Sequence, residues 1–243
     1  MRIPRIYHNG ELSVGLSIKL DEDAANHVGR VLRMQPEQEL LLFNGDCHDY
    51  QAQIESVSKK QVMVKVCDRT SVANESPINI HLAQGISRGD KMDFTIQKSV
   101  ELGITEITPI FTERCGVKLK GERLDKKHQQ WQKIAIAASE QCGRAKITKI
   151  NQPIQLNEFL KQKTDQLKLN LHPRATTTIK GLNLPPSGVR FIIGPEGGLD
   201  NSEIEQAQDA GYQEIQLGPR VLRTETAALT LLSALQLQFG DLA

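Results

Sequence analysis

The chain has 243 residues and a formal net charge of +1, so a polyanion would have to be bound by local clusters of positive charge and not by a uniformly basic surface. Apolar residues make up 39% and charged residues 24% of the chain, as in ordinary soluble proteins, and no apolar run approaches the roughly 18 residues of a membrane-spanning helix. We expect a cytoplasmic protein without a secretion signal or a membrane partner, whose four cysteines lack CxxC spacing and are reduced and mostly buried.

Residues 1–73 predict a small β-rich unit that contains one helix. The run Leu40–Phe43 is apolar, Tyr50–Val57 alternates loosely between apolar and polar residues, and Val62–Val66 alternates strictly, as a half-buried strand does. The segment Asp21–Met34 has acidic residues near its start and basic residues near its end, which is the distribution that the helix dipole favours. We therefore expect a helix there, between strands.

Strands and helices alternate from Ile78 onward, after a polar segment, Ser71–Pro77, in which we place a domain boundary between residues 73 and 74. Strands are expected at Ile78–Gln84, Glu106–Phe111, Leu167–Leu171, Val189–Ile193 and Glu214–Leu217. Helices are expected at Ser87–Gly103, Leu124–Gly143, Asn201–Ala210 and Leu222–Phe239, with start signals at Ser87 and Asp90, at Ser202 and Glu205, and at Thr224. This alternation predicts an α/β domain with a mostly parallel sheet and helices on both faces.

The loop Gly194–Leu199 directly follows the buried strand Val189–Ile193. Its adjacent Gly197 and Gly198 permit positive φ angles and let backbone N–H groups approach a ligand closely. A lone Gly-Gly pair is more often a tight structural turn. The loop matches neither GxGxxG nor the P-loop pattern, which makes it a poor fit to a dinucleotide or P-loop phosphate site.

A second Gly-Pro pair begins the loop Leu217–Ala227 after the next predicted strand, and His172-Pro173 follows a third. Open parallel sheets bind ligands beyond the carboxyl ends of their strands, so these three loops together predict a small-molecule pocket. Arg220 and Arg223 lie at the start of the last helix, where the dipole disfavours a cation. Either an external anion or polar partner, or an ion pair with Glu225 or Glu196, explains their position, and both readings stay open.

Two segments, GPEGGL and LGPRVLRTETA, resemble the signature of the SPOUT methyltransferases. Further segments occur in the order of one family within that group: MRIPRIY, HVGRVLRM, FTIQKSVELG, TERCGVK, WQKIAIAASEQCGR and LNLHP. Over nearly its whole length the chain therefore resembles the ribosomal RNA small subunit methyltransferase E family. These enzymes methylate N3 of a uridine in 16S ribosomal RNA.

The resemblance implies a PUA-like RNA-binding β-barrel over residues 1–73 and a SPOUT methyltransferase domain with a deep trefoil knot over residues 74–243. It implies S-adenosyl-L-methionine as cofactor, a homodimer, and 16S rRNA of the small ribosomal subunit as partner. The residues that match the family's cofactor loops are Leu171, His172, Pro173, Gly194, Pro195, Glu196, Gly197, Gly198, Leu217, Gly218, Leu222, Arg223, Thr224 and Ala227.

Methylation of uracil N3 requires removal of a weakly acidic ring proton, but no metal, and the chain has no metal-spaced cluster of ligands. A nearby arginine can stabilise the charge that develops on the uracil oxygens, and a carboxylate can take the proton. We expect Arg223 first and Arg114 second as the cation. Glu140 and Glu196 are the candidate bases, although for Glu196 a hydrogen bond that holds its loop is the favoured role.

Lysine and arginine contacts to phosphate dominate RNA affinity. In the N-terminal unit the expected RNA-binding residues are Arg2, Arg5, Arg30 and Arg33, and in the second domain they are Lys118, Lys120, Arg123 and Arg144. Aromatic residues make up only 4% of the chain, which favours recognition of shaped RNA over stacking on single-stranded bases.

Three other functions fit parts of the pattern. A ribose 2′-O RNA methyltransferase would have the same fold and a different target atom. A non-catalytic RNA-binding ribosome assembly factor would use the pocket structurally or not at all. A generic nucleotide-binding domain is disfavoured because the phosphate motifs are missing.

Overall fold

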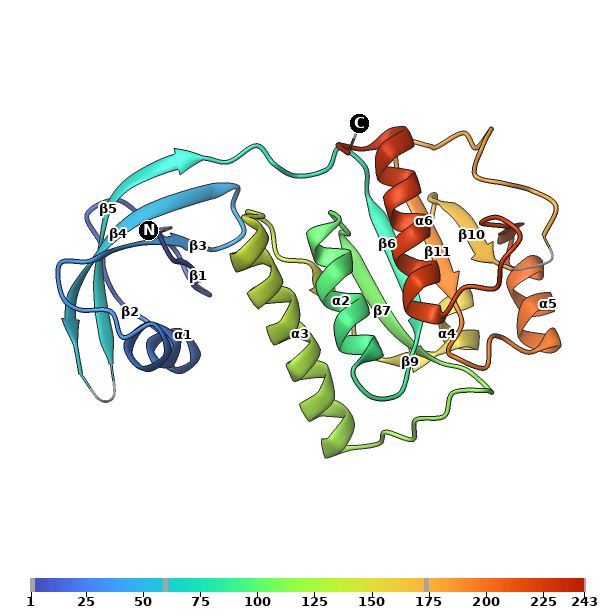
Figure 1. Cartoon of the computed structure of the whole chain (residues 1–243), viewed down its shortest axis with the longest axis horizontal. Helices are drawn as coiled ribbons and strands as arrows, with labels where there is room; N and C mark the ends of the chain where they lie inside the picture. Colours follow the sequence, from blue (N-terminus) through green and yellow to red (C-terminus); the bar gives the residue numbers. More distant parts are fainter. Residues whose placement is uncertain (1–2, 59–60, 173–174, 243) are drawn as a thin grey trace. The chain divides into compact units, whose positions relative to one another are not determined.

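A computed structural model describes residues 3–58, 61–172 and 175–242 (Figure 1). The chain is divided into two compact units, each of which has most of its contacts within itself. One comprises the chain up to Glu75 together with Ser139–Ile147, and the other comprises Ser76–Ala138 and the chain from Thr148 onward. The segment Ser139–Ile147 thus packs with the N-terminal unit, although the linear pattern assigns it to the second domain.

The first unit is built on a five-stranded sheet with the strand order β1-β3-β4-β5-β2. Its strands are β1 (Arg5–Tyr7), β2 (Ser17–Lys19), β3 (Glu39–Phe43), β4 (His48–Val57) and β5 (Val62–Ser71). The strict alternation in β5 is confirmed, because Val62, Val64 and Val66 all point into the core and are at most 1% exposed. Their neighbours on the other face are more exposed, as expected of a half-buried strand.

The helical segment of this unit is shorter than predicted. The helix α1 (Glu22–Asn26) begins as expected, since the Asp21 side chain accepts a hydrogen bond from Ala24 N. It continues as a π-helical turn, η1 (His27–Val31), in which i→i+5 hydrogen bonds replace the α-helical pattern. Arg33 lies beyond its end in a left-handed conformation, with φ 53°, so the prediction that the helix reaches Met34 is wrong.

The second unit contains a parallel sheet with the order β12-β10-β11-β6-β7-β8, and β9 also pairs with β7. Its strands are β6 (Ile80–Gly85), β7 (Glu106–Phe111), β8 (Lys149–Ile150), β9 (Ile154–Gln155), β10 (Leu167–Leu171), β11 (Val189–Ile193) and β12 (Gln213–Ile215). Its helices are α2 (Lys91–Glu101), α3 (Glu122–Cys142), α4 (Leu156–Leu160), α5 (Asn201–Asp209) and α6 (Thr224–Phe239). The last turn of α3 belongs to the first unit.

Helices cover both faces of this sheet, as predicted (Figure 1). Leu82 and Phe191 face a large core formed with α2, α3 and α6, whereas the adjacent Ala83 and Ile192 face a smaller core formed with α4 and α5. Every residue of β6 and β11 is consequently buried, which explains why neither strand alternates between buried and exposed positions.

Two helix starts differ from the sequence prediction. Helix α2 begins at Lys91, and the Ser87 hydroxyl donates to Gly85 O within the preceding loop. Helix α5 has a capping box formed by Asp200 and Glu203. The pattern at Ser202 and Glu205 lies two residues too late, and such patterns alone do not show which side chain reaches the backbone.

The sequence also predicts that the cysteines are free and mostly buried and that no helix spans a membrane. The four cysteines are free, but Cys67 is exposed and the other three are only partly buried, so the prediction of mostly buried thiols is wrong. Among the described residues, no helix is both long and apolar enough to span a bilayer.

Candidate active site

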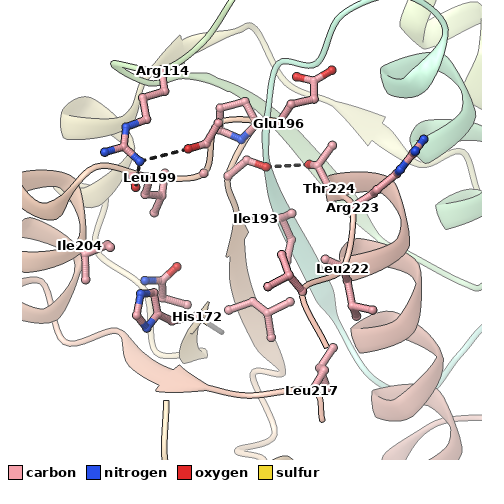
Figure 2. A pocket seen from close by; sticks show the side chains of 18 of the residues that line it. Arg114, His172, Ile193, Glu196, Leu199, Ile204, Leu217, Leu222, Arg223 and Thr224 are labelled. Atoms are coloured by element: carbon pink, nitrogen blue, oxygen red, sulfur yellow. Dashed lines mark hydrogen bonds between the residues drawn. The ribbon is translucent and has the colours of Figure 1, made fainter. Parts of the chain in front are cut away.

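A cavity of about 650 Å³ lies at the carboxyl ends of β10 and β11 and beside the loop after β12 (Figure 2). It brings the three predicted loops together. The cavity is lined by all the predicted cofactor residues that the structure describes: Leu171, His172, Gly194, Pro195, Glu196, Gly197, Gly198, Leu217, Gly218, Leu222, Arg223, Thr224 and Ala227. Pro173, the remaining one, lies outside the described residues.

Apolar side chains form much of the cavity wall. Ile193 ends β11, Leu217 and Leu222 belong to the loop before α6, and Ile204 comes from α5 (Figure 2). Leu199 closes the glycine-rich loop. Ile204 was not predicted, because its place one turn into an amphipathic helix gave no sign that it faces a ligand site. A volume and lining of this kind are typical of small-molecule sites.

Glycines allow the close packing of the loop Gly194–Leu199. Gly198 has a φ of 69°, as the Gly-Gly pair predicts. A Cβ atom on Gly194 would lie 2.9 Å from Leu199 N, and one on Gly85, at the end of β6, would overlap the backbone of Pro195. The loop is therefore pressed against the end of the central strand, and its backbone forms one side of the cavity.

Thr224 joins this loop to the last helix. Its hydroxyl donates to Gly194 O at 2.6 Å (Figure 2). It also accepts a hydrogen bond from Gln84 Nε2 at 2.8 Å. The predicted role of Thr224 as N-cap is wrong, because the N-cap is Arg223, which makes no side-chain capping bond. The buried Gln84 of β6 was not predicted, since an amide in a central strand gives no sign in the sequence of a partner 140 residues away.

Arg223 is an exposed cation at the edge of the cavity (Figure 2). Its side chain forms no hydrogen bond or ion pair with the parts of the chain that the structure describes. The expected alternative, an ion pair with Glu225 or Glu196, is therefore not formed. The guanidinium is therefore available to a ligand from outside the chain. Such a ligand would explain why a cation lies at the start of α6, where the helix dipole disfavours it.

Arg114 and Glu196 both hold the glycine-rich loop. Arg114 Nη1 donates to Gly197 O at 3.1 Å and to Leu199 O at 3.3 Å. Glu196 accepts from Arg88 N at 3.0 Å and from Lys91 Nζ at 3.2 Å. Partial burial raises the pKa of the Glu196 carboxyl, but its hydrogen bonds and Lys91 outweigh burial and hold the pKa below its usual value. The loop-holding role is confirmed, and a low pKa makes Glu196 a weak base.

Known protein families match both parts of the chain. Residues 74–236 match the family described as RNA methyltransferase domain, and residues 20–67 match the RNA methyltransferase PUA domain. The ribosomal RNA small subunit methyltransferase E of Buchnera aphidicola from Acyrthosiphon pisum is 39% identical over 241 residues, which are 99% of this chain and 95% of that one. The chain belongs to this family. The member from Bacillus subtilis is 31% identical and covers 89% of this chain and 88% of its own.

Solved structures of similar proteins share the whole fold. The ribosomal RNA small subunit methyltransferase E of Neisseria gonorrhoeae, bound to S-adenosylmethionine, is 38% identical with a TM-score of 0.92. A Legionella pneumophila protein with bound S-adenosylmethionine is 48% identical with a TM-score of 0.97. Both alignments cover 100% of each chain. The SPOUT-type α/β fold and the PUA-like N-terminal domain, both expected from the resemblance, are thereby confirmed.

Glu140, the other candidate base, belongs to the first unit of this family member. It does not line the cavity described above. Its Oε1 accepts from Tyr7 N at 2.9 Å. Burial raises the pKa of the Glu140 carboxyl, against the hydrogen bond from Tyr7 and the charges of His27 and Arg5. The carboxylate is therefore a stronger proton acceptor than Glu196.

Two of the expected RNA-binding residues are buried structural residues. The side chain of Arg5 is 7% exposed, pairs with Asp49 at 2.6 Å and donates to Ser139 O. The side chain of Arg144 is 8% exposed and pairs with Glu75 at 2.6 Å. Because their guanidinium groups are buried in these contacts, we assign them a structural role and leave them out of the proposed RNA contacts. They hold Ser139–Ile147 to the N-terminal sheet and the segment after it.

The other expected RNA-binding residues are exposed where the structure describes them. These are Arg30, Arg33, Lys118, Lys120 and Arg123. Arg2 lies outside the described residues. Lysine and arginine look alike in a charge count whether they are solvated or buried, so only the tertiary structure separates these five from Arg5 and Arg144.

Proposed function

We propose that this chain is a cytoplasmic enzyme that transfers a methyl group from S-adenosyl-L-methionine to N3 of one uridine in 16S rRNA of the small ribosomal subunit. The observation that carries the proposal is the cavity at the strand ends, with Arg223 at its edge. The relative from Neisseria gonorrhoeae, which has the family name and binds S-adenosylmethionine, supports it through full-length similarity.

The cavity fits this cofactor in size and chemistry. Bound S-adenosylmethionine supplies an electrophilic methyl group on a sulfonium. The apolar wall formed by Ile193, Leu217 and Leu222 suits the faces of a purine ring, and the glycine-rich loop offers backbone groups. The partly exposed Lys91 and the exposed Arg114 at the same cavity are charged groups that can bind the amino-acid end of the cofactor.

Arg223 is the residue that we place against the uracil. Loss of the N3 proton puts negative charge on the ring oxygens, and a fixed guanidinium stabilises that charge without reorganising. Arg223 has no internal partner to give up among the described residues, whereas Arg114 is already bound to Gly197 O and Leu199 O. Arg114 therefore takes second place. Glu140 stays our candidate base as a prediction from the sequence: burial raises its pKa, but it does not line the cavity, and reach comes before pKa for a base.

The exposed cations bind the RNA in this proposal. Arg30 and Arg33 act from the N-terminal domain of residues 1–73, and Lys118, Lys120 and Arg123 act from the methyltransferase domain of residues 74–243. Each phosphate contact makes binding more dependent on salt. Neutralising either group should therefore reduce the slope of log K against log salt concentration.

A homodimer is also part of the proposal. Helices α2 and α6 pack together and expose Phe94 and Leu237, which are 46% and 57% accessible. Large exposed apolar side chains on adjacent helices suit an interface between copies of the chain. Sedimentation of the wild type and of Leu237→Lys tests this assembly, and a wild type that sediments as a monomer would contradict it.

Mass spectrometry of 16S rRNA from cells with and without the gene tests the activity. We expect one uridine to lose its base methyl group in the deletion strain. Purified protein and S-adenosylmethionine should restore it on subunits from that strain. Loss of a ribose methyl group instead would indicate the 2′-O reaction, and an unchanged methylation pattern would indicate a non-catalytic assembly factor.

A further inference from the structure

Asn170 is a buried polar side chain in the cavity that lies in the segment LNLHP but has no role in the proposed chemistry. It lies near the end of β10, between Ile192 of β11 and Glu214 of β12 in the sheet register. It is 1% exposed and lines the cavity. Within the described parts of the chain, neither its Oδ1 nor its Nδ2 has a hydrogen-bond partner.

A buried side-chain amide without a hydrogen-bond partner requires an explanation. Leaving a buried donor and a buried acceptor unpaired is costly, and folded proteins keep few such groups. The preceding Leu169 is fully buried in the core, so an apolar side chain is the ordinary choice for this strand. Both atoms of the amide are unpaired, which calls for a ligand that offers a donor and an acceptor side by side.

This inference rests on the proposed function, in which the cavity binds the methyl donor. The charge of each part of the donor then decides which part lies beside Asn170. The carboxylate and ammonium groups of the donor would lose their hydration opposite a neutral amide at a 1% exposed position, which is strongly unfavourable. Charged partners are available elsewhere in the cavity, at Lys91, Arg114 and Glu196, all of which are more exposed. The neutral base of the donor therefore belongs beside Asn170.

We propose that Asn170 recognises the edge of the adenine ring of the methyl donor. Its Oδ1 accepts a hydrogen bond from the exocyclic amino group, and its Nδ2 donates one to the adjacent ring nitrogen. Asparagine pairs with adenine in this bidentate way in nucleic-acid recognition. The apolar Ile193 and Leu199 in the same cavity suit the faces of the ring. Asn170 is thus a specificity-determining residue for the cofactor.

Calorimetry with three probes tests this assignment: S-adenosylhomocysteine, adenosine, and purine riboside, which is adenosine without the exocyclic amino group. Wild-type protein should bind adenosine about tenfold more tightly than purine riboside, as expected for one lost hydrogen bond in a buried site. Asn170→Leu should weaken S-adenosylhomocysteine binding about 10- to 100-fold and bring the adenosine-to-purine-riboside ratio close to one.

Asn170→Asp is the matched variant, because it has nearly the same shape and keeps only the acceptor. It should retain the preference for adenosine while weakening the binding of both nucleosides. Thermal unfolding should show that both variants are folded. A ratio that stays at its wild-type value in Asn170→Leu would overturn the assignment to adenine, as would unchanged S-adenosylhomocysteine affinity. Failure of the wild type to bind S-adenosylhomocysteine would instead refute the proposed function.

Discussion

Replacing Thr224 with valine removes one hydroxyl group from the link between the glycine-rich loop and α6, with almost no change in side-chain shape. The Gly194 carbonyl loses a 2.6 Å hydrogen bond, and Gln84 Nε2 loses a 2.8 Å one. Gln84 Nε2 keeps a bond to Gly85 O at 3.1 Å, so the larger loss is at Gly194. With about 1–3 kcal/mol for a buried polar group left unpaired, we expect the free energy of unfolding to fall by about 2–3 kcal/mol.

For a protein of this size each kcal/mol lowers Tm by about 2–4 °C, so Thr224→Val should melt about 4–12 °C below the wild type. The affinity for S-adenosylhomocysteine should also fall, by about tenfold for 1.4 kcal/mol of loop distortion. Thr224→Ser keeps the hydroxyl and should restore most of both losses. Denaturant unfolding and calorimetry measure the two effects.

Gln84→Leu supplies the second arm of a double-mutant cycle. Because Gln84 and Thr224 share one hydrogen bond, the two substitutions together should cost less than the sum of the single ones, with a coupling energy of at least about 0.5 kcal/mol. Additive losses, or a Thr224→Val protein within about 0.5 kcal/mol of the wild type, would refute the reasoning.

Three further predictions follow from single side chains. Arg223→Ala should keep its Tm but lose most methyl transfer in a single-turnover assay, and near-normal turnover would rule out its catalytic role. Burial lowers the pKa of His81 in β6 to about 4, although the negative charge of Glu106 acts to raise it. As the pH falls, the histidine is therefore protonated in the unfolded chain before it is protonated in the folded one. Up to about 3 kcal/mol of stability should be lost between about pH 6.5 and pH 4. Urea unfolding should show a flatter pH dependence for His81→Gln, and an equal slope would contradict this account. Arg144→Ala removes the ion pair of the partly buried Glu75, which keeps a hydrogen bond from Lys146 N, so we expect a loss of at most about 3 kcal/mol. Lys146→Ala serves as the exposed control, and equal stabilities of the two variants would contradict a structural role for Arg144.

The longer strands of the second unit were predictable because they are short apolar runs bounded by turn residues, whereas the two-residue strands β8 and β9 were not predicted. The runs Leu167–Leu171 and Val189–Ile193 coincide with β10 and β11. Helix starts were less predictable, since Asp200 with Glu203 and Ser202 with Glu205 both fit the same pattern. Only the side-chain geometry shows that the first pair forms the capping box. A capping pattern describes residue types, whereas capping is a hydrogen bond.

The candidate site also has a part that was predictable from the sequence and a part that was not. The glycines and prolines of the loops are visible in the sequence because they serve local backbone conformations, such as the positive φ of Gly198. Gln84 and Asn170 were missed because a polar residue within a mostly apolar strand gives no sign in the sequence of what its side chain meets. The burial of Arg5 and Arg144 was not predicted, because it depends on partners such as Asp49 and Glu75.

By itself, the sequence determined the alternation of strands and helices, the parallel sheet and the three loops at the ends of its strands, all of which follow from hydrophobic runs and turn residues within short windows. The family resemblance added the cofactor and the reaction. The tertiary structure alone decided which polar groups meet, because the partners of Thr224 and Arg5 lie far away along the chain. It also decided that Ser139–Ile147 joins the N-terminal unit. Hydrogen bonds between distant residues leave no periodic signal, so their geometry must be observed.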